Sequence, residues 1–278
     1  MTTDAFPALD TDAIRETRDA LHAWSRVVGG WLKQSRAKRK HWWHISLRPS
    51  ISGLSTGVVR GSVDFEVELD LVSSRLRVRT DEREAVEELT GQSAAALAAW
   101  LEETLTDAGV DASLAPGADV RGDAEFPGYY AVQAGHLHRA FSSVAAALEN
   151  LRAGIREETS PIQVWPHHFD LSMIWLPGPK IAGQDPADEE HSDKQMNFGF
   201  VFGDAEISEP YLYVTAYPVP EAMPTVELPA GTTWRSEGFS GAVLLYRDLV
   251  AMDDPAACLQ GVFARLLAAG QAHLAVAA

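Results

Sequence analysis

Two short stretches of the sequence place ionisable side chains among large apolar ones. Residues 165–175 read WPHHFDLSMIW, and residues 38–50 read KRKHWWHISLRPS. Histidine and carboxylate side chains transfer protons or hold ligands, and tryptophan rings offer flat surfaces on which a ligand can stack. The two stretches are therefore the first places at which to expect a functional site.

Alternating polarity predicts that both stretches are β-strands, in which every second side chain points to the same face. The polar faces then carry His168, Asp170 and Ser172 in one strand, and His44, Ser46 and Arg48 in the other. Side chains two residues apart in a strand are about 7 Å apart, so Asp170 is expected to fix the tautomer of His168.

Three interpretations compete for these polar faces. In the first, the histidines are hydrogen-bonded residues of an ordinary sheet. In the second, the faces line a ligand pocket whose binding residues are Trp43, His44, Arg48, Trp165, His168 and Asp170. In the third, a metal-assisted hydrolase takes its ligands from His167, His168, Asp170, Glu189, Glu190, His191 and Asp193.

The metal-assisted interpretation has a geometric weakness. Consecutive residues His167 and His168 point to opposite faces of a strand, so only one of them can share a coordination sphere with Asp170. No HExxH spacing, G-x-G-x-x-G fingerprint or Walker sequence occurs in the chain, and the G-x-S-x-G match GLSTG at 53–57 lacks the following helix that a nucleophile elbow requires. We therefore predict no bound metal and no cofactor, and the sequence leaves open whether the protein is an enzyme.

The composition is that of an acidic globular protein, with 278 residues, 46% hydrophobic residues and a formal net charge of −16. Residues 1–122 carry 15 basic and 19 acidic side chains, whereas residues 123–278 carry 8 and 20. A nucleic-acid-coating protein needs basic residues in excess, so no nucleic-acid partner is expected. No signal peptide or long apolar run is present, which predicts a cytoplasmic protein without a membrane partner.

Periodicity predicts the elements that position these residues. Apolar residues at helical spacing predict a helix from Thr11 to about Ser35, with Asp12 near its start as a cap. Residues 63–79 alternate apolar residues with acids and then with arginines, which predicts a hairpin whose solvent-facing side carries ion pairs. Further helices are expected at 93–110, 129–158 and 255–274, with strands between the last two.

The order helix, antiparallel strands, helix occurs twice along the chain. The pentapeptides at 23–27 and 140–144 are similar, as are HISL at 44–47 and HFDL at 168–171. We therefore predict an α+β fold of two similar units related by internal duplication, residues 1–110 and 129–278, packed as one body. Residues 111–128 are predicted to be a linker or surface loop, and a continuous sheet without symmetry is the alternative fold.

Five segments in this order, HWWHISL, PIQVWPHHFDLSMIW, QMNFGFVFGD, PYLYVTAYPVP and GFSGAVLLY, resemble a bacterial family known as domain of unknown function five-nine-nine-six. The resemblance covers nearly the whole chain, and it implies no activity because no reaction is assigned to the family. The residues that match the family's typical pattern are His44, Trp165, Asp170, Asn197, Tyr213 and Tyr217. Through this resemblance Asn197 joins the predicted ligand-binding residues.

These observations favour a protein that binds a small ligand where the two polar strand faces meet. An anionic group on the ligand would suit Arg48, His44 and His168 in a chain that is otherwise strongly acidic. The alternatives are the metal-assisted hydrolase and a protein-interaction module with Trp42 or Tyr211 exposed. The loop at 177–195 is predicted to be either a lid or disordered, and the sequence does not predict the oligomeric state.

Overall fold

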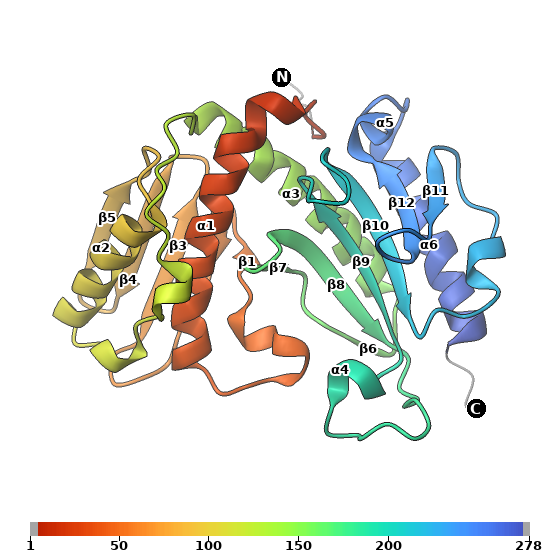
Figure 1. The fold of residues 1–278 in the computed structure, drawn as a ribbon, viewed down its shortest axis with the longest axis horizontal. Helices are drawn as coiled ribbons and strands as arrows, with labels where there is room; N and C mark the ends of the chain where they lie inside the picture. The colour runs from red at the N-terminus through yellow and green to blue at the C-terminus, as the bar shows by residue number, and fades with distance from the viewer. Residues whose placement is uncertain (1–4, 275–278) are drawn as a thin grey trace. The chain divides into compact units, whose positions relative to one another are not determined.

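The structure is a computed structural model that describes residues 5–274. It contains helices and two antiparallel sheets, which confirms the predicted α+β class (Figure 1). The chain forms two compact units. The first-sheet unit consists of Leu9–Ala140 and Gln163–Phe169, and the second-sheet unit contains residues 5–8, Phe141–Ile162 and 170–274. Helix α3 (Ala131–Ala153) runs from the first unit into the second.

Helix α1 (Thr11–Ser35) has the predicted bounds. Its cap is Asp10 rather than Asp12, because the Asp10 carboxylate accepts hydrogen bonds from the backbone N–H groups of Asp12 and Ala13 at 3.0 and 3.1 Å. The apolar stripe of the helix is buried. The Trp31 ring makes an edge-to-face contact with the ring of Phe65 in the first sheet, with 6.5 Å between the ring centres.

The first sheet is antiparallel, and its strands follow one another in chain order. They are β1 (Arg48–Pro49), β2 (Gly53–Ser55), β3 (Phe65–Asp70), β4 (Arg75–Thr80) and β5 (Glu84–Glu88). Helix α2 (Ala94–Asp107) follows and packs beside α1 (Figure 1). The 3-10 helices η2 (Ala112–Leu114) and η3 (Ala118–Val120) lie in the stretch predicted to be a linker or loop.

The predicted hairpin is confirmed as β3 and β4, and its charged face is held by ion pairs. Arg77 Nε lies 3.1 Å from Asp70 Oδ2, and Arg79 pairs with Glu68. The prediction that this face points to solvent is only partly right, because Glu68 and Asp70 are both buried. Burial raises the pKa of Asp70, but hydrogen bonds from Ser73 and Arg77 outweigh burial and leave that pKa below its usual value.

The second sheet is also antiparallel, in the order β11–β12–β10–β9–β8–β6. Its strands are β6 (Glu158–Thr159), β8 (Asp170–Leu176), β9 (Gln195–Val201), β10 (Tyr211–Tyr217), β11 (Thr232–Arg235) and β12 (Gly241–Leu245). The remaining helices are α4 (Glu189–Ser192), η4 (Met223–Thr225), α5 (Tyr246–Val250) and α6 (Pro255–His273).

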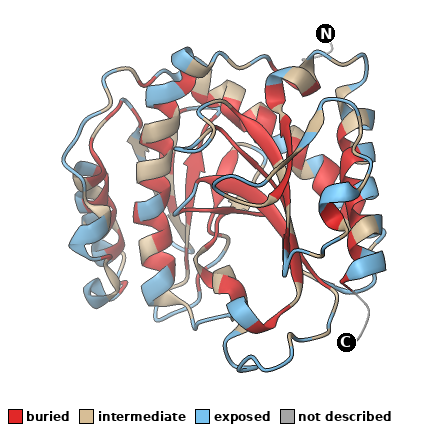
Figure 2. Ribbon diagram, turned by 45° about the vertical axis from the view of Figure 1, so that its right-hand side comes forward, coloured by how far each residue is buried: buried red, intermediate tan, exposed pale blue. Residues whose placement is uncertain are grey.

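One face of the second sheet is an aromatic core. Phe198 on β9 meets Phe263 of α6 at 5.8 Å, and Phe200 meets Phe141 of α3 at 6.1 Å. Gly270 of α6 lies so close to Met196 that a side chain at this position would overlap the methionine sulfur. Figure 2 shows buried residues concentrated on the strands and on one side of the helices. The other face carries polar residues on β8 beside a smaller apolar cluster that contains Val201, Tyr211 and Val243.

The structure does not confirm an internal duplication. The first sheet follows chain order, whereas the second places β12 between β10 and β11. The HISL segment runs out of a 3-10 helix, and the HFDL segment is a turn that enters β8. The two segments are therefore not matching strands, and the division of the chain into 1–110 and 129–278 stays a prediction.

Residues 177–195 are neither wholly irregular nor without contacts. They contain α4, and Ile181 N donates to Ser192 O at 2.8 Å. The Lys180 ammonium pairs with Asp193 and lies 3.2 Å from Ser192 Oγ. These contacts tie the two ends of the loop together within the second-sheet unit.

Candidate functional site

The first histidine-containing stretch was predicted to be a strand, and this prediction is wrong over most of its length. Residues Lys40–Ile45 form the 3-10 helix η1, in which His41 and Trp42 have left-handed backbone angles, with φ of 47° and 59°. Two consecutive left-handed residues reverse the chain, which an extended strand does not do. The Lys38 ammonium lies 5.1 Å from the centre of the Trp42 ring and stabilises this turn.

His44 is buried at the end of this turn. Its Nδ1 accepts a hydrogen bond from Arg39 N at 3.3 Å, and its ring stacks on Trp42 at 5.7 Å. Burial lowers the pKa of His44, and the positive charges of Lys38 and Arg36 lower it further. His44 is therefore a neutral, oriented ring at neutral pH rather than a cation that attracts an anionic ligand.

The second histidine-containing stretch is interrupted by a turn. Strand β7 (Gln163–Trp165) ends at Pro166, and Trp165 O accepts hydrogen bonds from the backbone N–H groups of His168 and Phe169 at 3.2 and 2.7 Å. Phe169 is buried with φ of +53°. The prediction that His168 and Asp170 share one strand face is wrong, because His168 lies in this exposed turn and β8 begins only at Asp170.

The two stretches nevertheless lie side by side within the first-sheet unit. Leu47 N donates to Val164 O at 3.0 Å, and Val164 N donates to Leu47 O at 2.8 Å. Residues paired in this way project to one side, and their chain neighbours project to the other. Leu47 and Val164 are both buried core residues, so the opposite side is formed by Ser46, Arg48, Gln163 and Trp165.

Gln163 organises this polar side. Its Oε1 accepts hydrogen bonds from Ser46 Oγ at 2.7 Å and from Arg48 Nη1 at 2.9 Å. A guanidinium group only donates, so the amide oxygen must face Arg48, and this fixes the orientation of the amide. Gln163 is fully buried, and its Nε2 has no hydrogen-bond partner among residues 5–274.

A second buried donor belongs to Trp43, whose backbone carbonyl shares a hydroxyl group with Gln163. Ser46 Oγ is 2.9 Å from Trp43 O as well as 2.7 Å from Gln163 Oε1, so Trp43 and Gln163 flank the same hydroxyl group. The indole Nε1 of Trp43 is buried and, within the described part of the chain, has no hydrogen-bond partner. Of these two N–H groups without acceptors, that of Gln163 belongs to the side chain that accepts a hydrogen bond from the Arg48 guanidinium.

The second-sheet unit holds a separate polar cluster on the face of the sheet that lies opposite the aromatic core. Ser172 on β8, Gly199 on β9 and Tyr213 on β10 are cross-strand neighbours in one row. A Cβ atom at Gly199 would lie 2.5 Å from the Tyr213 hydroxyl oxygen. The tyrosine thus crosses β9 over the glycine, and its hydroxyl donates to the carboxylate of Asp170 on β8.

This arrangement holds Tyr213 protonated. Burial raises the pKa of Tyr213 well above its usual value, and the neighbouring charge of Asp170 raises it further. Asn197 lies two residues before Gly199, on the same face of β9, and is half-buried. Tyr217 is two residues beyond Thr215 at the end of β10 and is partly exposed.

Tyr211, on the same face, also has a hydrogen-bonded hydroxyl group. It is buried, and its hydroxyl donates to Asp204 Oδ2 at 2.6 Å. The prediction that Tyr211 is an exposed contact for a protein partner is therefore wrong. Trp42, the other residue considered for that role, is half-buried against His44.

The predicted ligand-binding residues divide between the units. Those in the first-sheet unit are Trp43, His44, Arg48, Trp165 and His168, and those in the second-sheet unit are Asp170 and Asn197. Sequence reasoning missed the connecting residues Gln163 and Gly199. Gln163 could have been found from its spacing of two residues from Trp165, whereas the role of Gly199 depends on a neighbouring strand that the sequence does not identify.

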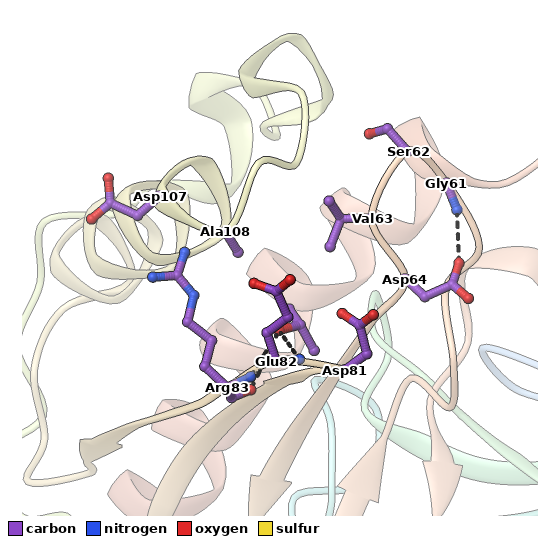
Figure 3. A pocket seen from close by; sticks show the side chains of 10 residues that line it. Gly61, Ser62, Val63, Asp64, Asp81, Glu82, Arg83, Asp107 and Ala108 are labelled. Atoms are coloured by element: carbon purple, nitrogen blue, oxygen red, sulfur yellow. Dashed lines mark hydrogen bonds between the residues drawn. The ribbon is translucent and has the colours of Figure 1, made fainter.

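A separate depression in the first-sheet unit is acidic. It has a volume of about 790 Å³ and is lined by residues 61–64, 80–83 and 107–108 (Figure 3). Its side chains include the carboxylates of Asp64, Asp81, Glu82 and Asp107, with Arg83 as the basic residue. No group of three His, Cys, Asp or Glu side chains among residues 5–274 is placed to hold a metal ion.

Comparison with known proteins gives one match. No curated protein and no solved structure matches the chain. None of the helices within residues 5–274 combines the length and the apolar character needed to cross a bilayer. The chain matches the Family of unknown function (DUF5996) over residues 6–275 and belongs to that family.

Proposed function

We propose that this protein binds a small ligand in the bacterial cytoplasm, and that the ligand presents an anionic or carbonyl acceptor group to the side formed by Ser46, Arg48, Gln163 and Trp165. The observation that carries the proposal is the buried Gln163 Nε2 without an acceptor, held beside the Arg48 guanidinium. The proposal concerns binding and assigns no reaction.

The energetic argument rests on the cost of unpaired donors. A buried N–H group without an acceptor costs about 1–3 kcal/mol, so a structure that retains such groups gains when an acceptor arrives. Gln163 Nε2 and Trp43 Nε1 are two such groups. A carboxylate or phosphate oxygen satisfies both kinds of donor and also pairs with Arg48.

The surrounding residues suit the apolar part of such a ligand. Trp165 is on the same side as Arg48, and the backbone carbonyl of Trp43 accepts a hydrogen bond from Ser46 Oγ at 2.9 Å. Indole rings provide stacking surface with little loss of side-chain entropy. His44, neutral and oriented, contributes a hydrogen-bonding ring rather than a charge.

Asp170 and Asn197 remain proposed ligand-binding residues on the polar face of the second sheet. The Asp170 carboxylate already accepts from Tyr213, and its place at the start of β8 follows directly on the turn that ends β7. His168 has no part in the proposal, because its side chain is exposed in that turn.

The proposal is tested by thermal-shift screening of the full chain against small carboxylates and phosphomonoesters, followed by calorimetry on those that raise the melting temperature. A ligand at about 100 times its Kd stabilises the native state by about 2.7 kcal/mol. If none of these compounds raises the melting temperature, the proposal fails.

The decisive variant is Gln163→Glu. It keeps an oxygen acceptor for Ser46 and Arg48 but removes the Nε2 donor and adds a negative charge. We expect carboxylate ligands to bind at least about tenfold more weakly to this variant, a loss of about 1.4 kcal/mol. Gln184→Glu, at an exposed loop position, adds the same charge and is the matched control. Equal binding by both variants would contradict the proposal.

A further inference from the structure

A second depression in the first-sheet unit is lined by glycines, prolines and small apolar residues, with basic and amide side chains among them. It has a volume of about 180 Å³ and lies between α1, the loop at 116–120 and the turn at 166–167. Arg26, Lys33 and Gln34 line it from α1, and His167 lines it from the turn. It contains none of the four residues on which the proposed function rests.

Two consecutive glycines in α1 create this depression. A Cβ atom at Gly29 would lie 2.6 Å from Pro166 Cγ, and a Cβ atom at Gly30 would lie 2.5 Å from Pro116 Cβ. The turn and the loop therefore reach the helix backbone, and they do so only because both positions lack a side chain. Glycine inside a helix costs about 0.5–1 kcal/mol relative to alanine, so this pair is retained for the close approach.

The charged groups converge on one stripe of the helix. Arg26 and Lys33 are seven residues apart, which is two helical turns, and both lie on the side that carries Gly29 and Gly30. Both side chains are exposed at the rim and can reorient toward a ligand. Arg26 Nη2 is 3.3 Å from Asp119 O, a long hydrogen bond that engages only part of its guanidinium group.

The electrostatic surroundings are positive in a chain whose net charge is −16. The charge of Lys33 lowers the pKa of His44, and the charge of Arg26 lowers the pKa of His22, in each case after the larger effect of burial. The lining contains one acidic residue, Asp119, and two residues that are cations, Arg26 and Lys33. An anion therefore gains from entering this depression, whereas a cation does not.

We infer that this depression binds a tetrahedral oxyanion, either free inorganic phosphate or the phosphate group of a small phosphomonoester. Arg26 supplies a planar fork of donors and Lys33 supplies a point charge, the combination typical of phosphate recognition. Gln34 and His167 add hydrogen-bonding groups at the rim. The volume is below the roughly 300–1,000 Å³ of a site that encloses a drug-sized molecule, so it fits a phosphate group alone.

The test measures binding of inorganic phosphate and of glycerol phosphate to the full chain by calorimetry at constant ionic strength. The double variant Arg26→Gln, Lys33→Gln removes both cations while keeping polar side chains. The matched control is Lys38→Gln, Arg39→Gln, which removes the same amount of charge at two nearby positions that do not line the depression. Unfolding by urea shows that each variant is folded, and Lys33→Gln alone is the fallback because its side chain is exposed.

We expect the Arg26, Lys33 variant to bind phosphate at least about tenfold more weakly than the native protein, and the control to change by less than about twofold. Equal affinity for the two ligands indicates a site for the free ion, and tighter binding of glycerol phosphate indicates a phosphomonoester. No binding of either ligand at millimolar concentration, or an equal loss in the control, would overturn the inference. The Gln163→Glu variant should bind phosphate here unchanged, so failure of one proposal leaves the other standing.

Discussion

At the scale of single residues, the ionisable groups among the aromatic residues have individual partners. His44 is held neutral by burial and by a backbone donor, and the Asp170 carboxylate accepts a hydrogen bond from the Tyr213 hydroxyl. The prediction that these groups lie on polar faces holds for Asp170 but not for His168. The sequence shows which residue types are present, but the partner across a sheet is set by strand order.

His138 gives a pH prediction at this scale. It is buried, its Nε2 lies 3.1 Å from Ile51 O, and burial lowers its pKa despite the opposing effects of this contact and of Asp70. Because the folded protein binds this proton less tightly than the unfolded chain, the free energy of unfolding falls as pH drops below about 6.5. His138→Gln keeps an N–H donor for Ile51 but carries no titrating proton.

The fall in unfolding free energy between pH 7.5 and pH 5 should therefore be smaller in His138→Gln than in the native protein. Urea unfolding at both pH values measures it. Burial also lowers the pKa values of His22 and His44, so part of the fall persists in the variant. An identical fall in the two proteins would show that His138 does not contribute.

At the scale of elements, long periodic segments could be predicted and tight turns could not. Helix α1 and the β3–β4 hairpin have the predicted form because each repeats its pattern over several turns or pairs. The turn of η1 depends on left-handed angles at His41 and Trp42, for which no glycine or asparagine gives a signal. Pro166 did give a signal, because proline cannot donate to a sheet and favours the end of a strand.

Gly199 gives a prediction about how β8, β9 and β10 fit together. In Gly199→Ala the new methyl group meets the Tyr213 ring, which must leave its place above β9 and lose its hydrogen bond to Asp170. We expect a loss of about 1–3 kcal/mol in unfolding free energy, measured in urea. The control is Gly135→Ala in α3, where no atom lies within 4 Å of the new methyl group and a gain of about 0.5–1 kcal/mol is expected. Similar changes in both variants would contradict this account.

At the scale of the whole molecule, the α+β class could be predicted from the alternation of helical and strand patterns, whereas the division into compact units could not. The segment Gln163–Phe169 belongs with Leu9–Ala140, although more than twenty residues of the chain separate them. Its place is set by the pairing of Leu47 with Val164, a contact between residues far apart in sequence. Periodicity reports local structure and carries no information about such contacts.

Net charge gives the last prediction. At −16, with 39 acidic and 23 basic side chains, the folded chain repels itself, and added salt screens that repulsion. Exposed ion pairs such as that of Arg247 with Glu209 are weakened by salt, but each contributes only about 0–1 kcal/mol. The melting temperature should therefore rise when KCl is increased from about 20 mM to about 500 mM. Screening acts on all charges, so the melting temperature of the Arg26→Gln, Lys33→Gln variant should also rise in KCl. Stabilisation by millimolar phosphate at fixed ionic strength should, in contrast, be lost in that variant. A falling melting temperature in KCl would mean that the ion pairs outweigh the repulsion.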